Sequence, residues 1–447
     1  MGGGARVPLE DAAFERPRSS GDMSTDSRWH STPILRFAFH RTGRTATDET
    51  DALPGSPRSR APLHRGSNVS PMRRLKRHAV ARRLLASHAV HVLRSWLRPR
   101  SSSRPAVDDA ATVALAAPVE AGWPEGTPRP RVALAKDHAS NPWWPKFERF
   151  LEHNGFDYDI VDIHRSDWLE RIKTFDAFVW RPRSHASVLE EARRKVYVLE
   201  SHVGIRCLPS YRSLLLYEDK LLQYYLLRHH DLPTIRTFAS HDAAEARERA
   251  DSMRYPVVSK LVTGSGSEGV ELIPDAGAYR RLAASVFSPI GRATYWGYLR
   301  QKDYLLLQDY VEHDGYDLRI IVVGDAIFGY YRRPVAGDFR ASGSGLVEKR
   351  EIPTAAMRLA LDVCAALDER TLAVDFLRDR TGAFQIIEVS AFIRVDTPEQ
   401  LVVAGQPGMY LVDRGTFTFV PGRYWIQELA LKDFLRRAFI EGGETQL

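Results

Sequence analysis

The sequence is poor in cysteine and has no long apolar run. Only two cysteines occur in 447 residues, Cys207 and Cys364, which excludes a disulfide framework and a four-ligand zinc site. So few cysteines make a reducing cytoplasm the simplest compartment. No stretch approaches 18 consecutive apolar residues, so we expect no membrane-spanning helix. The His-Glu-x-x-His run of metalloproteases and the Gly-x-Ser-x-Gly turn of serine hydrolases are also lacking.

Charge is unevenly distributed along the chain. The composition, 44% hydrophobic and 27% charged, is that of an ordinary soluble protein, and the length suffices for two or three domains. The net charge is +7, but residues 53–107 alone carry 13 Lys and Arg and no acidic residue. The rest of the chain has 50 basic and 56 acidic residues. The basic character therefore belongs to one segment, and a general nucleic-acid-binding function loses most of its support.

Residues 1–129 contain Arg-, Pro- and Ser-rich runs, and we expect them to form a basic, largely disordered extension. Within it, residues 72–98 can form a basic helix, which favours weak contact with an anionic membrane or with nucleic acid. The alternatives are a solvated tail, or leader sequence upstream of the real start, because Met72 directly precedes this helix. Acidic residues before the helix argue against an organelle-targeting segment.

Order is expected from Arg131 onward, where strand and helix patterns alternate. The run RVALAKD is typical of a buried strand, and WWPKFERFLEHNG is an amphipathic helix with Gly155 placed to end it. FDYDIVDI, FDAFVW and IRCLPS are further strands, with a helix through SVLEEARRKVYVLESHVG. The alternation predicts a parallel α/β domain over residues 130–212. Its first strand-to-helix turn has no glycine, which excludes a Rossmann dinucleotide site there.

The segment Gly264–Gly269 fits the Gly-x-Gly-x-x-Gly pattern letter for letter. The dinucleotide fingerprint requires a helix after the glycines, but strand-like residues stand on both sides here, and no Gly-Lys-Ser/Thr completes a Walker A loop. A glycine loop between strands can still hold phosphate through its backbone N–H groups. Lys260, on the preceding strand, is costly to bury unless an anion meets it. The alternative is an exposed hairpin with a surface lysine.

A second hairpin is predicted from TLAVDFLRDRTGAFQIIEVSAF, with strands Leu372–Leu377 and Phe384–Val389. A turn centred on its Thr-Gly pair places Asp375 directly opposite Glu388, with Cβ atoms roughly 5 Å apart. Two desolvated carboxylates at that spacing repel each other, and a divalent cation such as Mg²⁺ relieves the repulsion. The structural alternative is pairing of these carboxylates with arginines. The candidate arginines are Arg332, Arg333 and Arg340.

Five motifs in this order resemble the ATP-grasp superfamily, in particular its ribosomal-protein glutamate ligase and glutathione synthetase branch. They are Lys220, Lys260 with its glycine loop, LLLQDYVEHDGYDLRIIVVGD, RRP…DFRASGSG and AVDF…IIEVS, spread over about residues 131–436. The resemblance implies an α/β (α+β) fold in which two subdomains clamp ATP between antiparallel sheets. The implied divisions are an N-terminal α/β domain over 130–212, a lid over 213–308, a catalytic subdomain over 309–436 and a tail over 437–447.

The resemblance also implies roles for individual residues in binding ATP. The two lysines would contact the phosphates, the glycine loop would cover the β- and γ-phosphates, and the hinge strand from Gln308 to Val311 would meet adenine. Asp317, or in its place Glu312 or Asp314, would hold the ribose. The ATP-binding residues so implied are Lys220, Lys260, Gly264, Ser265, Gly266, Ser267, Gly269, Gln308, Asp309, Tyr310, Val311 and Asp317.

The implied ligands for Mg²⁺, with Mn²⁺ as an alternative, are Asp375, Glu388 and Ser390. The third is a departure, since the family usually has an asparagine at this position and a hydroxyl is a weaker neutral ligand. The FRASGSG run also lacks the asparagine and glycine pair common in the peptide-forming ligases. Both departures resemble a less-studied bacterial ATP-grasp group met beside cell-surface polysaccharide functions. They leave the nucleotide site intact and the substrate undefined.

The implied reaction is an ATP- and Mg²⁺-dependent ligation of a carboxylate to an amine through an acyl phosphate, on an amino acid or a cell-surface sugar acid. Such chemistry needs charge neutralisation more than a protein nucleophile. Arg332, Arg333 and Arg340 are the candidate catalytic residues, because guanidinium groups bind carboxylates and phosphoryl groups bidentately; a surface salt bridge is the alternative for each. An ATP-grasp small-molecule kinase and a non-catalytic ATP-binding module stay open as alternative functions. We expect ATP, an acid and an amine as partners, and an oligomer.

Overall fold

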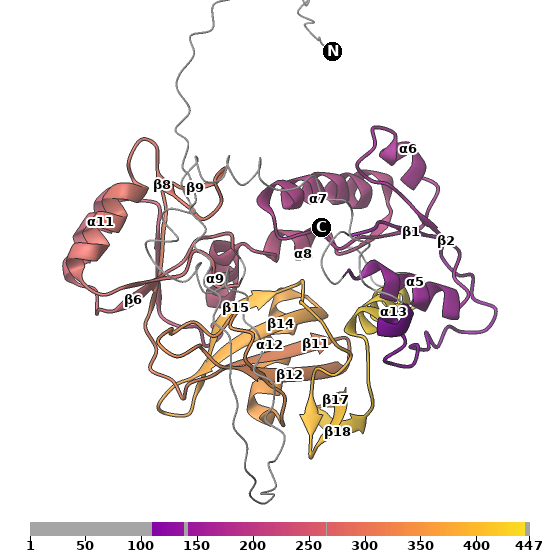
Figure 1. Cartoon of the computed structure of the whole chain (residues 1–447). Coiled ribbons are helices and arrows are strands. Elements are labelled where there is room, and N and C mark those ends of the chain that lie inside the picture. The colour runs from indigo at the N-terminus through magenta and orange to yellow at the C-terminus, as the bar shows by residue number, and fades with distance from the viewer. Residues whose placement is uncertain (1–109, 138–141, 265, 443–447) are drawn as a thin grey trace, which may run out of the picture. The chain divides into compact units, whose positions relative to one another are not determined.

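The computed structural model describes residues 110–137, 142–264 and 266–442 (Figure 1). Most of the expected N-terminal extension, including its helix over 72–98, lies outside the described residues. The same holds for Ser265 and for residues 443–447 of the expected tail. No helix in the three described ranges is long and apolar enough to cross a membrane.

Four short parallel strands form the N-terminal sheet, in the order β2-β1-β3-β4. Their bounds are β1 Val132–Leu134, β2 Tyr158–Ile160, β3 Ala177–Val179 and β4 Arg206–Leu208. The helices between them are α5 Trp144–His153, α6 Trp168–Ile172 and α7 Ala186–Val198, with a π-helical turn, Leu199–Val203, directly after α7. Gly155, just beyond α5, has a φ of 65°, the left-handed conformation expected of a residue that ends a helix. The predicted parallel α/β arrangement is confirmed.

The ordered region begins before the expected boundary at residue 130. It opens with a short helix, α4 Ala110–Val113, and the following segment reaches the main core through the buried side chain of Val119. The backbone N–H of Val119 donates to Glu428 Oε2 at 3.1 Å. The rings of Trp123 and Phe156 meet edge to face, with centroids 5.0 Å apart. A few apolar anchors, which show no periodicity in the sequence, thus attach this segment to the folded part.

The lid contains an antiparallel sheet of its own, in the order β5-β10-β6-β7. Its strands are β5 Thr237–Ser240, β6 Val257–Ser259, β7 Glu271–Ile273 and β10 Leu305–Asp309, beside a small ladder of β8 Arg292–Ala293 and β9 Arg300–Gln301. The helices of this region are α8 Tyr211–Leu216, α9 Lys220–His229, α10 Ala243–Glu248, a 3₁₀ turn Arg249–Asp251, and α11 Ala276–Val286. The sheet, α10 and α11 enclose a separate core that includes Val257, Tyr279 and Leu305. Helices α8 and α9 of the same predicted lid segment pack instead into the main core, through Leu214 and Leu227.

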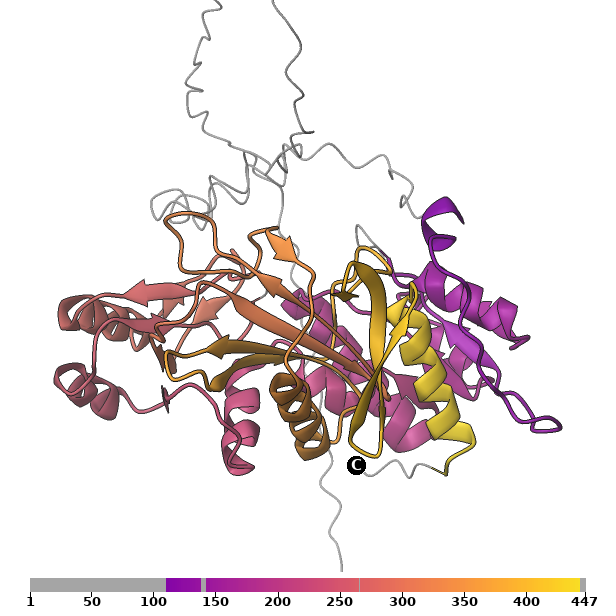
Figure 2. The same cartoon turned by 90° about the horizontal axis from the view of Figure 1, so that it is seen from below.

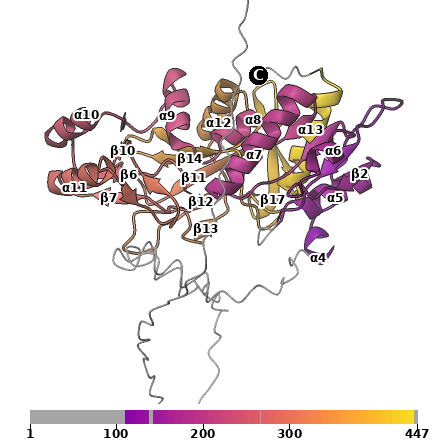
Figure 3. The ribbon, with the colours of Figure 1, turned by 90° about the horizontal axis from the view of Figure 1, so that it is seen from above.

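The large sheet of the catalytic subdomain has the order β15-β14-β11-β12-β17-β16, with β13 on β12 and β18 on β17. Its strands are β11 Asp317–Val323, β12 Ala326–Arg332, β13 Val347–Glu348, β14 Thr371–Arg378, β15 Phe384–Ser390, β16 Val402–Val403, β17 Gln406–Asp413 and β18 Thr416–Pro421. Two helices, α12 Thr354–Leu367 and α13 Ile426–Phe439, pack on one face of the sheet (Figure 2). Helix α13 also packs against α5 (Figure 3), so the N-terminal domain and the catalytic subdomain share one core.

Candidate functional site

A cavity of about 570 Å³ lies where the lid, the catalytic sheet and the end of β3 meet. Its volume falls within the usual range for small-molecule sites. Most of the predicted ATP-binding, metal-binding and catalytic residues that the structure describes border this cavity. The exceptions are Gly269, Glu312, Asp314 and Arg333. Residues more than a hundred positions apart in sequence, such as Lys260 and Glu388, are therefore brought to the walls of one space.

The glycine loop joins β6 and β7, which pair as antiparallel strands, so the predicted strand–loop–strand arrangement is confirmed. Gly264, Gly266 and Gly269 all have positive φ angles. A Cβ atom at Gly264 would lie 2.7 Å from the carbonyl oxygen of Glu268, and one at Gly269 would lie 2.4 Å from the Leu261 side chain. Larger residues at these positions would break the tight turn. Ser265, also predicted to bind ATP, lies outside the described residues.

The glycine loop touches the loop that follows β12. Ser267 Oγ donates a hydrogen bond to the carbonyl oxygen of Ser342 at 2.9 Å. Gly343 has a φ of 77°, and a Cβ atom there would lie 2.8 Å from the carbonyl oxygen of Gly266. Two glycine-rich loops, one from the lid and one from the catalytic subdomain, thus meet at the edge of the cavity.

Two buried lysines stand beneath the glycine loop in different environments. Lys220, the first residue of α9, donates to the carbonyl oxygen of Gly264 at 2.7 Å and lies 3.3 Å from Glu388 Oε1. Burial alone would lower the pKa of Lys220, but Glu388 and Glu218 outweigh it and raise the pKa above its ordinary value. Lys260 contacts only the carbonyl oxygen of Ile387, at 3.4 Å, and burial lowers its pKa to about 8. Among the described residues, no carboxylate lies within ion-pair distance of Lys260, so an anion bound in the cavity would be its first close partner.

The predicted hinge runs from the end of β10 into the cavity wall. Gln308, Asp309, Tyr310 and Val311 all border the cavity. The Gln308 side chain donates to Thr237 Oγ1 at 3.3 Å, while the carboxylate of Asp309 accepts from Arg236 at 2.7 Å. The side chains of Gln308 and Asp309 are thus held by Thr237 and Arg236.

A buried network of charges forms the floor of the cavity. Arg319 makes two parallel hydrogen bonds with Asp375, both 2.7 Å long, and Arg332 binds Asp317 in the same way at 2.7 and 2.8 Å. Arg332 also reaches Asp375 Oδ2 at 2.8 Å and so links the two pairs. Burial would raise the pKa of Asp375, but the two guanidinium groups outweigh it and hold the pKa well below its usual range. The pKa of Asp317 moves the other way, because burial exceeds the effect of Arg332.

Asp375 and Glu388 lie opposite each other on β14 and β15, as the position of the turn predicted, with a β-bulge directly after Asp375. Arginines hold both oxygens of Asp375, whereas the Glu388 side chain is 28% exposed and has only the Lys220 ammonium beside it. Ser390 also borders the cavity and donates to the carbonyl oxygen of Phe392 at 2.8 Å. The described residues contain no group of three acidic, cysteine or histidine side chains suited to a metal. Two carboxylates and a hydroxyl on the wall of one cavity fit Mg²⁺, which is commonly held by one or two carboxylates and by substrate phosphates.

The three candidate catalytic arginines have different surroundings. Arg332 is buried in the network described above, with Asp317 and Asp375 as partners. Arg333, the residue directly after β12, lies on the face opposite to Arg332 if the strand alternation continues, and it pairs with Glu348 at 2.8 Å outside the cavity. Arg340 borders the cavity, pairs with Asp338 at 2.8 Å and donates to the carbonyl oxygen of Val270 in the lid at 3.3 Å.

Several residues of the cavity were missed by the sequence analysis. Arg319 lies two positions after Asp317 on the same face of β11, and this spacing in DLR could have indicated it. Glu218 accepts a hydrogen bond from the backbone N–H of Gly264 at 2.9 Å, a long-range contact that no local pattern indicates. Arg181 comes from the N-terminal domain, immediately after β3. Of the two other ribose candidates, Glu312 pairs with Arg380, and neither Glu312 nor Asp314 borders the cavity.

Comparison with known proteins identifies the central part of the chain. Residues 217–402 match the family described as RimK-like ATP-grasp domain. The alpha-aminoadipate–LysW ligase LysX of Saccharolobus solfataricus is 26% identical over 260 residues, which cover 56% of this chain and 89% of that protein. The glutamate–LysW ligase ArgX of Sulfurisphaera tokodaii is 22% identical over 254 residues, with 56% and 84% covered.

This chain also resembles two solved structures at low sequence identity. The RimK domain protein ATP-grasp from Sphaerobacter thermophilus has 18% identity, covers 58% of this chain and 90% of its own, and gives a TM-score of 0.42. The D-alanine–D-alanine ligase from Bacillus anthracis complexed with ATP has 16% identity, covers 59% and 86%, and gives a TM-score of 0.43.

Proposed function

We propose that this chain, whose residues 217–402 match the RimK-like ATP-grasp domain, activates a small carboxylic acid with ATP and joins it to an amine. The observation that carries the proposal is the convergence of Lys220, Lys260 and the two opposed carboxylates, Asp375 and Glu388, beneath the glycine loop. This set offers two lysine ammonium groups to bind phosphate and two carboxylates to bind a divalent ion. The backbone of the glycine loop would cover the bound phosphates. It offers no nucleophile, as expected for transfer of a phosphoryl group directly between substrates.

In the proposed nucleotide site, the backbone beyond β10 meets adenine and the phosphates lie toward the two lysines. Lys260 has no ion pair within the part of the chain that the structure describes, so the negative phosphates would stabilise its ammonium form. The N–H groups of Gly264–Gly269 cover the phosphates and exclude water. We keep the ribose contact with Asp317 as a prediction, with both its oxygens also bound to Arg332.

The metal ligands that we propose are Glu388 and Asp375, with Ser390 as a neutral oxygen. ATP-grasp ligases use Mg²⁺ with ATP, and when bound the ion neutralises phosphate charge. Glu388 is the more accessible of the two carboxylates, while Arg319 and Arg332 fix the position of Asp375. Lys220 lies beside Glu388 and would share in binding the same phosphates.

The proposed reaction has two steps. First, one carboxylate oxygen of the acid attacks the γ-phosphorus and the bond to ADP breaks, which gives an acyl phosphate and ADP. The amine nitrogen then attacks the acyl carbon, loses a proton and displaces phosphate to leave an amide. Arg340 borders the cavity next to the glycine loop and is placed to bind the acid or its phosphorylated form. Closure of the lid protects the acyl phosphate from hydrolysis.

We propose an amino acid as the acid substrate, because the relatives reported above are named for alpha-aminoadipate and glutamate. A sugar acid is the second candidate, in line with the FRASGSG resemblance. We place the reaction in the cytoplasm, where the two buried, unpaired cysteines would stay reduced.

A single assay separates this proposal from its alternatives. The full chain is incubated with ATP, Mg²⁺ and pooled amino acids or sugar acids, each with an amine pool, and ADP, free phosphate and product mass are followed. We expect substrate-dependent release of ADP and phosphate in equal amounts, with an amide as product. ADP with a phosphorylated product would instead identify a kinase. ATP binding without turnover in any pool would identify a non-catalytic module.

A further inference from the structure

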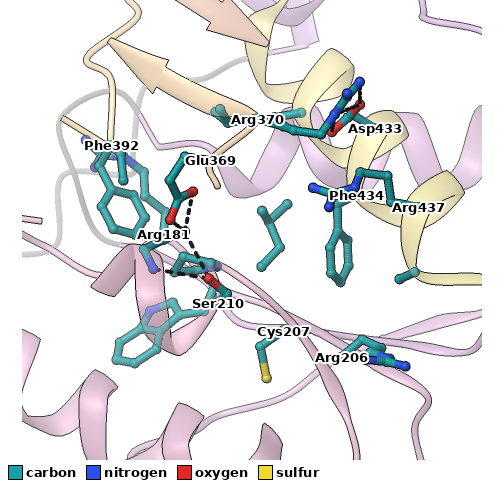
Figure 4. A pocket seen from close by; sticks show the side chains of 18 of the residues that line it. Arg181, Arg206, Cys207, Ser210, Glu369, Arg370, Phe392, Asp433, Phe434 and Arg437 are labelled. Carbon is teal, nitrogen blue, oxygen red and sulfur yellow. Dashed lines mark hydrogen bonds and ion pairs between the residues drawn. The ribbon is translucent and has the colours of Figure 1, made fainter. Parts of the chain in front are cut away.

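Arg181 stands at the boundary between two cavities. It follows strand β3 and borders both the large cavity described above and a smaller one of about 200 Å³. Phe392, just beyond β15, also borders both. Figure 4 shows Arg181 and Phe392 on one side of the smaller cavity and the Arg370–Asp433 ion pair on the other. Arg181 is thus a residue of the N-terminal domain that lines the large cavity.

The other arginines of the large cavity already have carboxylate partners. Arg319 and Arg332 are bound to Asp375 and Asp317, and Arg340 is bound to Asp338. Arg394 pairs with Asp396 at 3.0 Å. Among the described residues, Arg181 alone of the arginines around this cavity has no ion pair. An unneutralised guanidinium in a pocket is a binding element for an anion.

Arg181 also leaves a polar atom unsatisfied. Its Nε is buried and has no hydrogen-bond partner among the described residues. A buried donor without a partner is costly, and the great majority of such groups in folded proteins are paired. The guanidinium carbon lies 5.3 Å from the centre of the Trp143 ring, a contact that holds the group in place without using its donors. The contact with Trp143 therefore holds the guanidinium in place at the wall of both cavities, where it can donate to a ligand.

We infer that Arg181 binds a second anionic group of the acid substrate, so that this substrate is an acid with two negative groups. The inference rests on the proposed function, in which the reacting carboxylate must meet the γ-phosphate near Lys220 and Lys260. These lysines belong to the predicted lid segment, whereas Arg181 belongs to the N-terminal domain and lines the cavity together with Phe392. One anionic group is activated at the lysines, and the other is held at Arg181 and sets the length of the acid that fits.

The test uses the full chain and pairs of acids. Each pair compares aspartate, glutamate or aminoadipate with an analogue of the same length whose distal carboxylate is replaced by an amide or another uncharged group. ADP release is measured with an amine pool for the wild type and for Arg181→Gln, Arg181→Lys and Arg183→Gln. Arg183 is the matched control, since it is exposed, lies two residues away and borders neither cavity.

We expect the wild type to prefer acids with two negative groups. Arg181→Gln should raise the KM for the acid by about 10- to 100-fold, the loss expected of a charge-assisted pair, and remove the preference over uncharged analogues. The KM for ATP should not change, and Arg181→Lys should recover part of the affinity. Arg183→Gln should behave as the wild type.

Two results overturn the inference while leaving the ligase intact. One is a wild type that uses singly charged acids as well as doubly charged ones. The other is an Arg181→Gln enzyme with unchanged KM and selectivity. If the wild type forms no amide from any acid, the result contradicts the proposed ligase function and therefore also the role of Arg181 that depends on it.

Discussion

Asp375 and Glu388 face each other across β14 and β15, yet their carboxylates have different partners. Arg319 and Arg332 bind Asp375, which is buried, while Glu388 faces the cavity beside Lys220. The first carboxylate is therefore part of the folded core as well as of the site. The second contributes mainly to the site.

This difference predicts that neutralising the two carboxylates has unequal effects on stability. Asp375→Asn removes the negative charge that neutralises the two buried guanidinium groups of Arg319 and Arg332. It should lower the free energy of unfolding by about 3–5 kcal/mol. Glu388→Gln should cost about 1 kcal/mol, because its side chain is 28% exposed and Lys220 keeps its bond to Gly264. Urea unfolding of the two variants measures both values.

Both substitutions should abolish Mg²⁺-dependent ADP formation at saturating acid and amine. The informative variant is Glu388→Gln, which should be folded and inactive. Full activity in Glu388→Gln would remove this carboxylate from the proposed metal site. Equal stability of the two variants would contradict the structural role of Asp375.

Lys260→Ala is expected to abolish detectable ATP binding, because it removes a buried ammonium that has no ion pair among the described residues. The matched control is Lys302→Ala, an exposed lysine of the lid that pairs with Asp303 away from the cavity. Isothermal titration with a non-hydrolysable ATP analogue measures both affinities. Unchanged ATP affinity in Lys260→Ala would refute the proposed phosphate site.

ATP affinity should depend on pH through Lys260. Burial lowers its pKa to about 8 in the free protein, and bound phosphate favours the ammonium and raises that pKa. Binding therefore takes up a proton above about pH 8, and affinity should fall as the pH rises through that value. A Lys260→Arg protein, whose guanidinium does not titrate in this range, serves as the control and should lack this fall. Parallel pH profiles of the two proteins would contradict the assignment.

The contact between the two glycine-rich loops can be tested with a pair of glycine substitutions. Gly343→Ala places a Cβ atom 2.8 Å from the carbonyl oxygen of Gly266 and should push the lid loop away, with a loss of turnover of about 10- to 100-fold. Gly337→Ala has the same kind of backbone, with φ near 79°, but meets nothing within 4 Å. It should lose about 1–2 kcal/mol of stability and keep its turnover. Equal turnover in both variants would show that the loop contact is not needed for catalysis.

Local patterns in the sequence predicted much of the fold. The opposition of Asp375 and Glu388 followed from the turn of one hairpin, and the strands around the glycine loop followed from the residues next to it. Both are short-range features, in which register is set within about twenty residues. Lys260 was predicted on the strand before the loop, and it directly follows β6, which ends at Ser259.

The partners of these residues could not be predicted in the same way. Among the arginines considered for Asp375, Arg332 does bind it, but Arg319 from β11 binds it too, while Arg333 pairs with Glu348 instead. The pairing of strands far apart in sequence determines such contacts, and one sequence carries no signal for it. Arg181 was missed for a related reason, since it enters the site from a different domain.

The most direct measurement follows the oxygen atoms of the acid. With an acid labelled with ¹⁸O in its reacting carboxylate, one labelled oxygen should pass into the released phosphate, because the amine breaks the bond between the acyl carbon and that oxygen. When both oxygens of that carboxylate are labelled, we predict that each ADP formed is matched by one phosphate carrying one ¹⁸O and by one amide that keeps the other ¹⁸O. Mass spectrometry measures both products. Unlabelled phosphate, or a phosphorylated product that retains all of the label, would contradict the carboxylate–amine ligase proposed here.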